Sequence, residues 1–211
     1  MLKQLNNSIM PISDKYKLIF VHIPKNAGTA ITNTLEMVDI GHHGWSYYKN
    51  KYPNKWENYK KISVIRNPWD RVVSCYEYAK MDKSYWHAKE DKARAGKHPD
   101  YELLKDKTFE ECLDILKNTP QKLKHQGWRN QSDYIYQNNQ LMVDYTLDMY
   151  EINDKLTDLL GFEINIPKVN VSNNKDYREY YVNNNLIDIV SKNCKIDLIN
   201  FNYEQSFNIL S

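Results

Sequence analysis

The sequence predicts an α/β fold in which helices flank a mainly parallel central sheet. Two observations support this prediction: short apolar runs alternate with helical patterns, and two of the runs end in a tight turn that opens a helix. The chain has 211 residues, of which 41% are hydrophobic and 27% are charged, so it is long enough to bury one sizeable core. We therefore expect a single domain over residues 1–211, with an insertion or lid at about 82–127.

The first strand, turn and helix lie near the start of the chain. Residues 17–22 (KLIFVH) form an apolar run that is typical of a buried strand. Pro24 and Gly28 indicate a turn over residues 23–28, and a helical pattern follows over residues 29–38. Such a junction directs backbone N–H groups and the positive end of a helix dipole at one point, which suits an anion.

A second unit of the same kind follows. Residues 61–66 (KISVIR) predict a strand, and the helix after it should run over residues 68–81. Asn67 is a good N-cap residue, and Pro68 suits the first helical position. Between the two units, residues 39–59 contain Gly41, Gly44 and Pro53 and predict a loop-rich segment.

The middle of the chain is the least regular part. Residues 82–100 are dense in charge and poor in aliphatic side chains, which predicts an exposed excursion or a mobile lid. Residues 108–118 then have the pattern of an amphipathic helix.

The last third returns to alternating strand and helix. Residues 142–150 predict a third strand, and residues 152–160 predict a helix that stops at Gly161. Residues 185–201 predict a final helical stretch, with Asn193 as the position where it could break.

Charge and cysteine content exclude several classes of protein. The net charge is only +2, so nothing at the level of the whole chain indicates a nucleic-acid or membrane-surface partner. The chain has three cysteines, Cys75, Cys112 and Cys194, and no CxxC pair. An odd number of widely spaced cysteines argues against a disulfide framework or a zinc site. No signal-like or membrane-spanning apolar segment is present, so we expect a cytoplasmic protein.

The turn after the first strand carries residue types that bind a phosphate or phosphosulfate. Gly28 lets the backbone come close to a ligand, Lys25 adds a positive charge, and Thr29 adds a hydroxyl at the helix start. An ordinary surface turn would explain the same residues, with Lys25 solvated and Thr29 as a cap. His22 is expected to be structural, with its ring packed below the turn. The GxxxxGK[ST] spacing is absent, which argues against the usual P-loop ATPases and kinases.

The end of the second strand offers a second anion site. Arg66 closes the strand, and Ser74 lies eight residues later, about two turns into the helix. A guanidinium fork with a hydroxyl suits a terminal phosphate, although a structural ion pair and a filler serine would also explain them. Two such sites predict a ligand with phosphates at two places, in the crevice at the carboxyl ends of the parallel strands.

Together the two segments resemble the sulfotransferases that use 3′-phosphoadenosine 5′-phosphosulfate (PAPS). Residues 22–29 (HIPKNAGT) are similar to the 5′-phosphosulfate loop of that family, and residues 64–74 (VIRNPWDRVVS) to its 3′-phosphate motif. The branch most similar is the carbohydrate type, which includes heparan sulfate 2-O- and chondroitin or dermatan sulfotransferases and bacterial relatives. Weaker similarity covers residues 131–135, 145–151 and 170–181. Met149 stands where the family often has an Arg.

The resemblance implies a P-loop-like three-layer sulfotransferase fold and a defined set of roles. A sulfuryl group would pass from PAPS to an acceptor hydroxyl, or less commonly an amine, and leave adenosine 3′,5′-bisphosphate. Lys25 would contact the 5′-phosphosulfate and stabilise the leaving phosphate, while Arg66 and Ser74 would hold the 3′-phosphate. The same 5′-group would be bound through N–H groups and a hydroxyl by Asn26, Ala27, Gly28, Thr29 and Ala30. No metal is required.

A hydroxyl acceptor needs a general base. Two adjacent histidines, His42 and His43, lie between the two motifs, in the interval where the similar enzymes carry their base. The relatives often place a His two residues after a Gly, and Gly41 makes that spacing favour His43 over His42. Imidazole titrates near neutrality and can take the proton. Both can instead be ordinary loop histidines, with Glu36 or Asp39 as the base.

The acceptor would be recognised by the middle loop and the insertion at about 82–127, where Trp and Tyr lie beside Lys and Arg. This composition suits an anionic carbohydrate, but ordinary packing explains it equally, and a small molecule remains an alternative. The lack of a leader favours a bacterial or viral setting. The rival functions are an ATP-dependent small-molecule kinase and a non-catalytic module that binds a nucleotide or an anionic glycan. The sequence makes no prediction of the oligomeric state.

Overall fold

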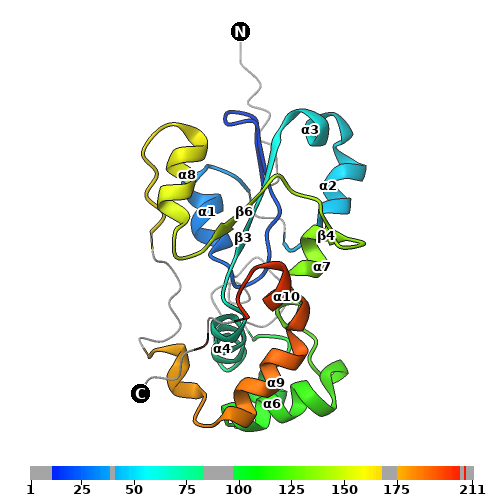
Figure 1. The fold of residues 1–211 in the computed structure, drawn as a ribbon, viewed down its shortest axis with the longest axis vertical. Coiled ribbons are helices and arrows are strands. Elements are labelled where there is room, and N and C mark those ends of the chain that lie inside the picture. The colour runs from blue at the N-terminus through cyan, green and yellow to red at the C-terminus, as the bar shows by residue number, and fades with distance from the viewer. Residues whose placement is uncertain (1–10, 39–40, 83–96, 168–174, 205–206, 208–211) are drawn as a thin grey trace. The chain divides into compact units, whose positions relative to one another are not determined.

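The computed structural model describes residues 11–38, 41–82, 97–167, 175–204 and 207 (Figure 1). The chain forms two compact units. Unit 1 comprises residues 1–66 and 131–169, and unit 2 comprises residues 67–130 and 170–211. The prediction of one domain with an insertion at about 82–127 stays a prediction.

Unit 1 is built on a four-stranded sheet. In spatial order its strands are β1 (Ile12–Ser13), β2 (Leu18–Phe20), β3 (Lys60–Ile65) and β6 (Tyr145–Asp148). Only β1 is antiparallel to its neighbour; β2, β3 and β6 are parallel, with Phe20 opposite Ile62 and Ile65 opposite Asp148. The predicted class, an α/β fold with a mainly parallel sheet, is therefore confirmed.

Helices α1 (Gly28–Thr34) and α8 (Ile152–Leu160) cover one face of this sheet (Figure 1). Alternate residues of the strands point toward them, because side chains alternate faces along a strand. The resulting core is apolar and includes Leu18, Phe20, Ile31, Ile62, Val64, Leu147 and Leu156. Helix α8 ends at Gly161 in the left-handed conformation, with φ of 76°, as the sequence predicts. Helix α1 is shorter than the predicted 29–38.

The prediction that residues 39–59 form a loop is wrong, because two helices lie there on the other side of the sheet (Figure 1). They are α2 (Trp45–Lys51) and α3 (Pro53–Asn58). Gly44 is the N-cap of α2 and Pro53 is the first residue of α3, so these two residues start helices instead of marking a loop. Tyr48 of α2 and Trp56 of α3 are buried, so each helix contributes a large side chain to the interior.

The chain returns to unit 1 through α7 (Ser132–Ile135) and a small hairpin. Strands β4 (Tyr136–Gln137) and β5 (Gln140–Leu141) pair antiparallel. Asn138 and Asn139 form the two-residue turn, and both have positive φ, which asparagine tolerates better than most residues.

Unit 2 is helical. Its elements are α4 (Pro68–Ala79), α5 (Tyr101–Leu104), η1 (Pro120–Lys122), η2 (Gln126–Trp128), η3 (Tyr177–Tyr180), α6 (Phe109–Asn118), α9 (Asn184–Asn193) and α10 (Lys195–Asn200). Asn67 caps α4 as predicted, because its side chain accepts from the N–H groups of Trp69 at 3.0 Å and Asp70 at 3.4 Å. The predicted amphipathic helix is α6, which Thr108 and Glu111 begin with a reciprocal capping box. The last helical stretch breaks at Cys194, next to the predicted position.

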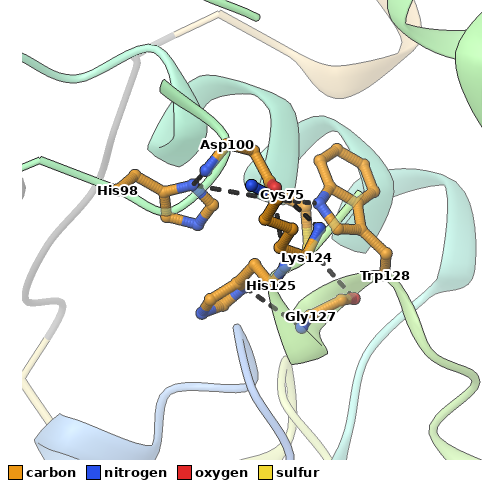
Figure 2. Close-up of polar contacts among 7 residues, drawn as sticks. All are labelled: Cys75, His98, Asp100, Lys124, His125, Gly127 and Trp128. Atoms are coloured by element: carbon orange, nitrogen blue, oxygen red, sulfur yellow. Dashed lines mark hydrogen bonds and ion pairs between the residues drawn. The ribbon is translucent and has the colours of Figure 1, made fainter. Parts of the chain in front are cut away.

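The predicted excursion at 82–100 is only partly described, since residues 83–96 lie outside the described ranges. In its described end, Lys97 and Pro99 are exposed, whereas His98 and Asp100 are only 3% and 1% exposed, so the expectation of an exposed segment is corrected at these two residues. Asp100 is buried because its carboxylate accepts three N–H bonds, from Lys124 N, His125 N and Trp128 Nε1, at 2.6, 3.1 and 2.9 Å (Figure 2).

Cys75, Cys112 and Cys194 are buried, and none of the three forms a disulfide. Within the described ranges, no helix combines the length and the apolar surface that crossing a bilayer requires.

Candidate active site

The turn between β2 and α1 is the first half of the site. Lys25 and Ala27 both have left-handed backbone conformations, with φ of 70° and 57°. Ala27 is the N-cap of α1 and has no side chain able to cap the helix, so the first N–H groups of α1 receive no bond from the N-cap side chain. Backbone amides gathered in a turn of this kind make a concave anion-binding surface. Lys25 is placed in that turn, as the sequence predicts.

Asn26 holds the turn to the sheet. Its side chain is fully buried, and its Nδ2 donates to Val64 O and to Gln131 Oε1, each at 2.7 Å. The carboxamide therefore points into the protein. The predicted contact of Asn26 with a 5′-phosphosulfate therefore falls on its backbone N–H and stays a prediction.

Arg66 reaches the first motif directly. Its Nη1 donates to Lys25 O at 3.0 Å, so the guanidinium at the end of β3 lies against the backbone of the turn after β2. The two motifs are 41 residues apart at this contact in the sequence. Parallel neighbouring strands bring their carboxyl ends to one edge of the sheet, and this explains the meeting.

Gly28 allows a buried histidine to pack below the turn. A Cβ atom on Gly28 would lie 1.8 Å from His22 Nε2, so only glycine fits this position while His22 stays in place. His22 is 4% exposed and stacks on Phe20. The expected packing of His22 below the turn is confirmed.

Thr29 and Ala30 occupy the first turn of α1 with different surroundings. Thr29 is partly exposed, whereas the Ala30 side chain is buried in the core, so a role for Ala30 in binding falls on its N–H group. Thr32, which the sequence analysis did not single out, donates its hydroxyl to Gly28 O at 3.0 Å and tightens this turn.

The two candidate bases have different neighbours. The His42 ring meets the His22 ring edge-on, with centroids 4.4 Å apart, and so belongs to the packing below the turn. The His43 ring instead stacks on Tyr47 of α2 at 3.9 Å. Lys51 donates to the Tyr47 hydroxyl at 2.8 Å, and this hydrogen bond raises the pKa of Lys51.

The remaining candidates lie elsewhere. Ser74 belongs to unit 2, where it is buried in α4. Glu36 is exposed and forms an ion pair with Lys15 at 3.8 Å, while Asp39 lies outside the described residues. Burial raises the pKa of the Cys112 and Cys194 thiols to about 12, which keeps both protonated at neutral pH and excludes them as nucleophiles.

Gln131 is the contact residue that sequence reasoning missed. Its side chain bonds both Asn26 and Arg66. It begins the segment 131–135, whose weak similarity to the family was noted, but that similarity gave the glutamine no role. Among the described residues, no group of three or more His, Cys, Asp or Glu side chains is placed to hold a metal ion.

Comparison with protein families decides the class of the molecule. A sequence model of the sulfotransferase family matches residues 10–204, nearly the whole chain. The chain belongs to the sulfotransferase family. It is a sulfotransferase enzyme by this membership, and the sheet and turn described above agree with that fold. Comparisons with curated proteins and with solved structures gave no match.

Gly28→Ala should destabilise the sulfotransferase by about 1–3 kcal/mol, because the new methyl group would overlap the His22 ring. Thermal unfolding of Gly28→Ala, His22→Ala and the double variant measures this. Removing the ring should relieve the overlap, so the double variant should lose less stability than the sum of the single variants. Simple additivity would contradict the packing described here.

Proposed function

We propose that this sulfotransferase takes its sulfuryl group from PAPS and transfers it to an acceptor hydroxyl, releasing adenosine 3′,5′-bisphosphate. The observation that supports this most is the contact of the Arg66 guanidinium with Lys25 O at 3.0 Å. It joins a cation at one strand end to an amide-rich turn at the next, and a nucleotide with phosphates at two places needs such a pair of anion sites.

The roles of the donor-site residues follow from their chemistry. The N–H groups of residues 26–30 and the Thr29 hydroxyl bind the 5′-phosphosulfate, and Lys25 stabilises the charge that grows on the leaving phosphate. Arg66 holds the 3′-phosphate. Ser74 joins it in this role on the strength of the sequence motif alone.

The transfer is an in-line displacement at sulfur. The acceptor oxygen forms the new S–O bond while the S–O bond to the 5′-phosphate breaks, and the electron pair of that bond stays on the phosphate. The acceptor proton passes to a histidine. His43 is proposed as this base, because it lies beside helix α2 and not in the packing below the turn; His42 is the alternative.

Helix α2 supports an anionic acceptor, such as a carbohydrate. Lys49 lies over the Trp45 ring at 5.9 Å and Lys51 over the Tyr47 ring at 5.1 Å, so cations and flat rings alternate next to His43. Rings stack on sugar faces and cations pair with carboxylate or sulfate groups. The segment at about 82–127 stays a proposed acceptor-side insertion.

Calorimetric titration with adenosine 3′,5′-bisphosphate tests the donor. Binding should need no Mg²⁺ and should be tighter than that of ATP, ADP or 5′-AMP. Arg66→Ala should weaken it about 10- to 100-fold, the loss expected for a charged hydrogen bond, while Lys105→Ala on an exposed ion pair should leave it unchanged. Preference for Mg-ATP would favour the kinase alternative, and no nucleotide binding would favour the glycan-binding module.

Replacing the histidines one at a time tests the base. His43→Ala should lower sulfuryl transfer from labelled PAPS about 10²- to 10⁴-fold across a panel of carbohydrate and small-molecule acceptors, with unchanged affinity for the bisphosphate. His42→Ala, its matched partner, should cost much less transfer. If His42→Ala lost more transfer than His43→Ala, the base would be His42. Equal small losses would show that neither histidine is the base.

A further inference from the structure

Gln131 occupies a special place along the chain. Arg66 is the last residue before the chain leaves unit 1, and Gln131 is the first residue after it returns. The Gln131 side chain is fully buried. A buried carboxamide has to be hydrogen-bonded to be tolerated, so its partners show what it does.

Two of those partners are the main-chain groups of Arg66. Gln131 Oε1 accepts from Arg66 N at 2.9 Å, and Gln131 Nε2 donates to Arg66 O at 2.8 Å. Strand β3 ends at Ile65, whose O accepts from Met149 N at 2.9 Å. The glutamine side chain therefore supplies, one residue beyond the strand, the pair of bonds that a neighbouring strand would make. It fixes the main chain from which the Arg66 side chain extends.

The third partner is the anion-binding turn. Gln131 Oε1 also accepts from Asn26 Nδ2 at 2.7 Å, and the same Nδ2 donates to Val64 O at 2.7 Å. A backbone N–H can only donate and a backbone O can only accept, so Arg66 fixes which end of the Gln131 amide is oxygen. That oxygen and Val64 O are both acceptors, so the Asn26 atom that faces them has to be the donor Nδ2. The orientation of both amides is thus determined by the main chain.

Asn26 depends on this arrangement. Its Oδ1 is buried and has no hydrogen-bond partner among the described residues, so the side chain is held through Nδ2 alone. Loss of the Gln131 oxygen would leave one Nδ2 hydrogen unpaired as well as the Oδ1 acceptor, and an unpaired buried polar group is costly. The turn between Lys25 and Ala27 would then lose one of the two bonds that tie its Asn26 side chain to the sheet.

We propose that Gln131 is a positioning residue of the donor site, which sets the turn at Asn26 and the Arg66 main chain at one fixed separation. This inference rests on the proposed function of that site. The residue touches no ligand itself. It acts by aligning the amides that bind the 5′-group with the guanidinium that binds the 3′-phosphate. The hydrogen bond from Arg66 Nη1 to Lys25 O is a second link between the same two segments.

The test compares three variants by calorimetry with adenosine 3′,5′-bisphosphate and with 5′-AMP. Gln131→Leu keeps the approximate volume and removes every hydrogen bond. Gln131→Glu keeps the acceptor oxygen and loses the donor to Arg66 O. Gln137→Leu, at an exposed position of β4 in the same unit, is the control.

Gln131→Leu should weaken the binding of the bisphosphate at least tenfold and the binding of 5′-AMP by less. The reason is that only the bisphosphate has a 3′-phosphate, whose contribution to binding depends on Arg66. The ratio of the two affinities should therefore fall. A merely structural glutamine would change the melting temperature and leave this ratio as it is. Gln137→Leu should change neither affinity.

Gln131→Glu adds a readout that depends on pH. Burial raises the pKa of a carboxyl above its ordinary value of about 4.3, and the protonated form can again donate to Arg66 O. Bisphosphate affinity of this variant, relative to the unchanged protein, should be low at pH about 8 and recover as the pH falls toward about 5.5. The variant also serves if Gln131→Leu does not fold.

The outcomes separate the two proposals. Unchanged protein that binds no bisphosphate would overturn the proposed function and this inference with it. If the unchanged protein binds, and folded Gln131→Leu binds with the same affinity ratio, the positioning role alone is overturned. A Gln131→Glu variant with normal affinity at both pH values would overturn it too. Failure of both variants to fold would make Gln131 a folding determinant and would also reject the proposal.

Discussion

The proposed donor site depends on one small network of buried amides. Gln131 pairs with both main-chain groups of Arg66, and Asn26 bonds Gln131 and Val64. Each bond is worth only about 1 kcal/mol net, but leaving any of these buried groups unpaired costs more. The network therefore has one low-energy arrangement. In that arrangement a strand end and a flexible turn become a rigid pair, which is the preorganisation that anion binding requires.

The parallel sheet supplies the coarse geometry, and the amides refine it. Parallel pairing of β2 and β3 brings both motif ends to one edge, and glycine at position 28 lets the His22 ring fill the space below the turn. Left-handed backbone at Lys25 and Ala27 then turns the chain into α1. Sulfuryl transfer needs little covalent help from the protein, so fixed positions and charges account for most of the catalysis we propose.

Local signals in the sequence were enough to predict the fold class and to find the two motifs. Apolar runs predicted β2 and β3, and the alternating pattern of residues 142–150 predicted β6. Asn67 with Pro68 and the stop at Gly161 predicted helix ends. The prediction of a loop over residues 39–59 was wrong because Gly and Pro can also begin helices. The burial of Tyr48 and Trp56 depends on tertiary packing, which local sequence patterns do not show. The role of Gln131 could not be predicted, although residues 131–135 have weak family similarity, because its partners lie 65 and 105 residues away in the sequence. The sequence motifs indicate candidate ligand-binding residues, but they do not indicate the residues that position those side chains and turns.

The most direct measurement is the backbone amide NMR spectrum of the protein during addition of adenosine 3′,5′-bisphosphate. If the turn and the end of β3 form one donor site, the largest shifts should fall on the amides of residues 25–30 and of Arg66, and should saturate together with one dissociation constant. Saturation of the two groups at different concentrations, or shifts confined to other parts of the chain, would contradict a single nucleotide site at this edge of the sheet.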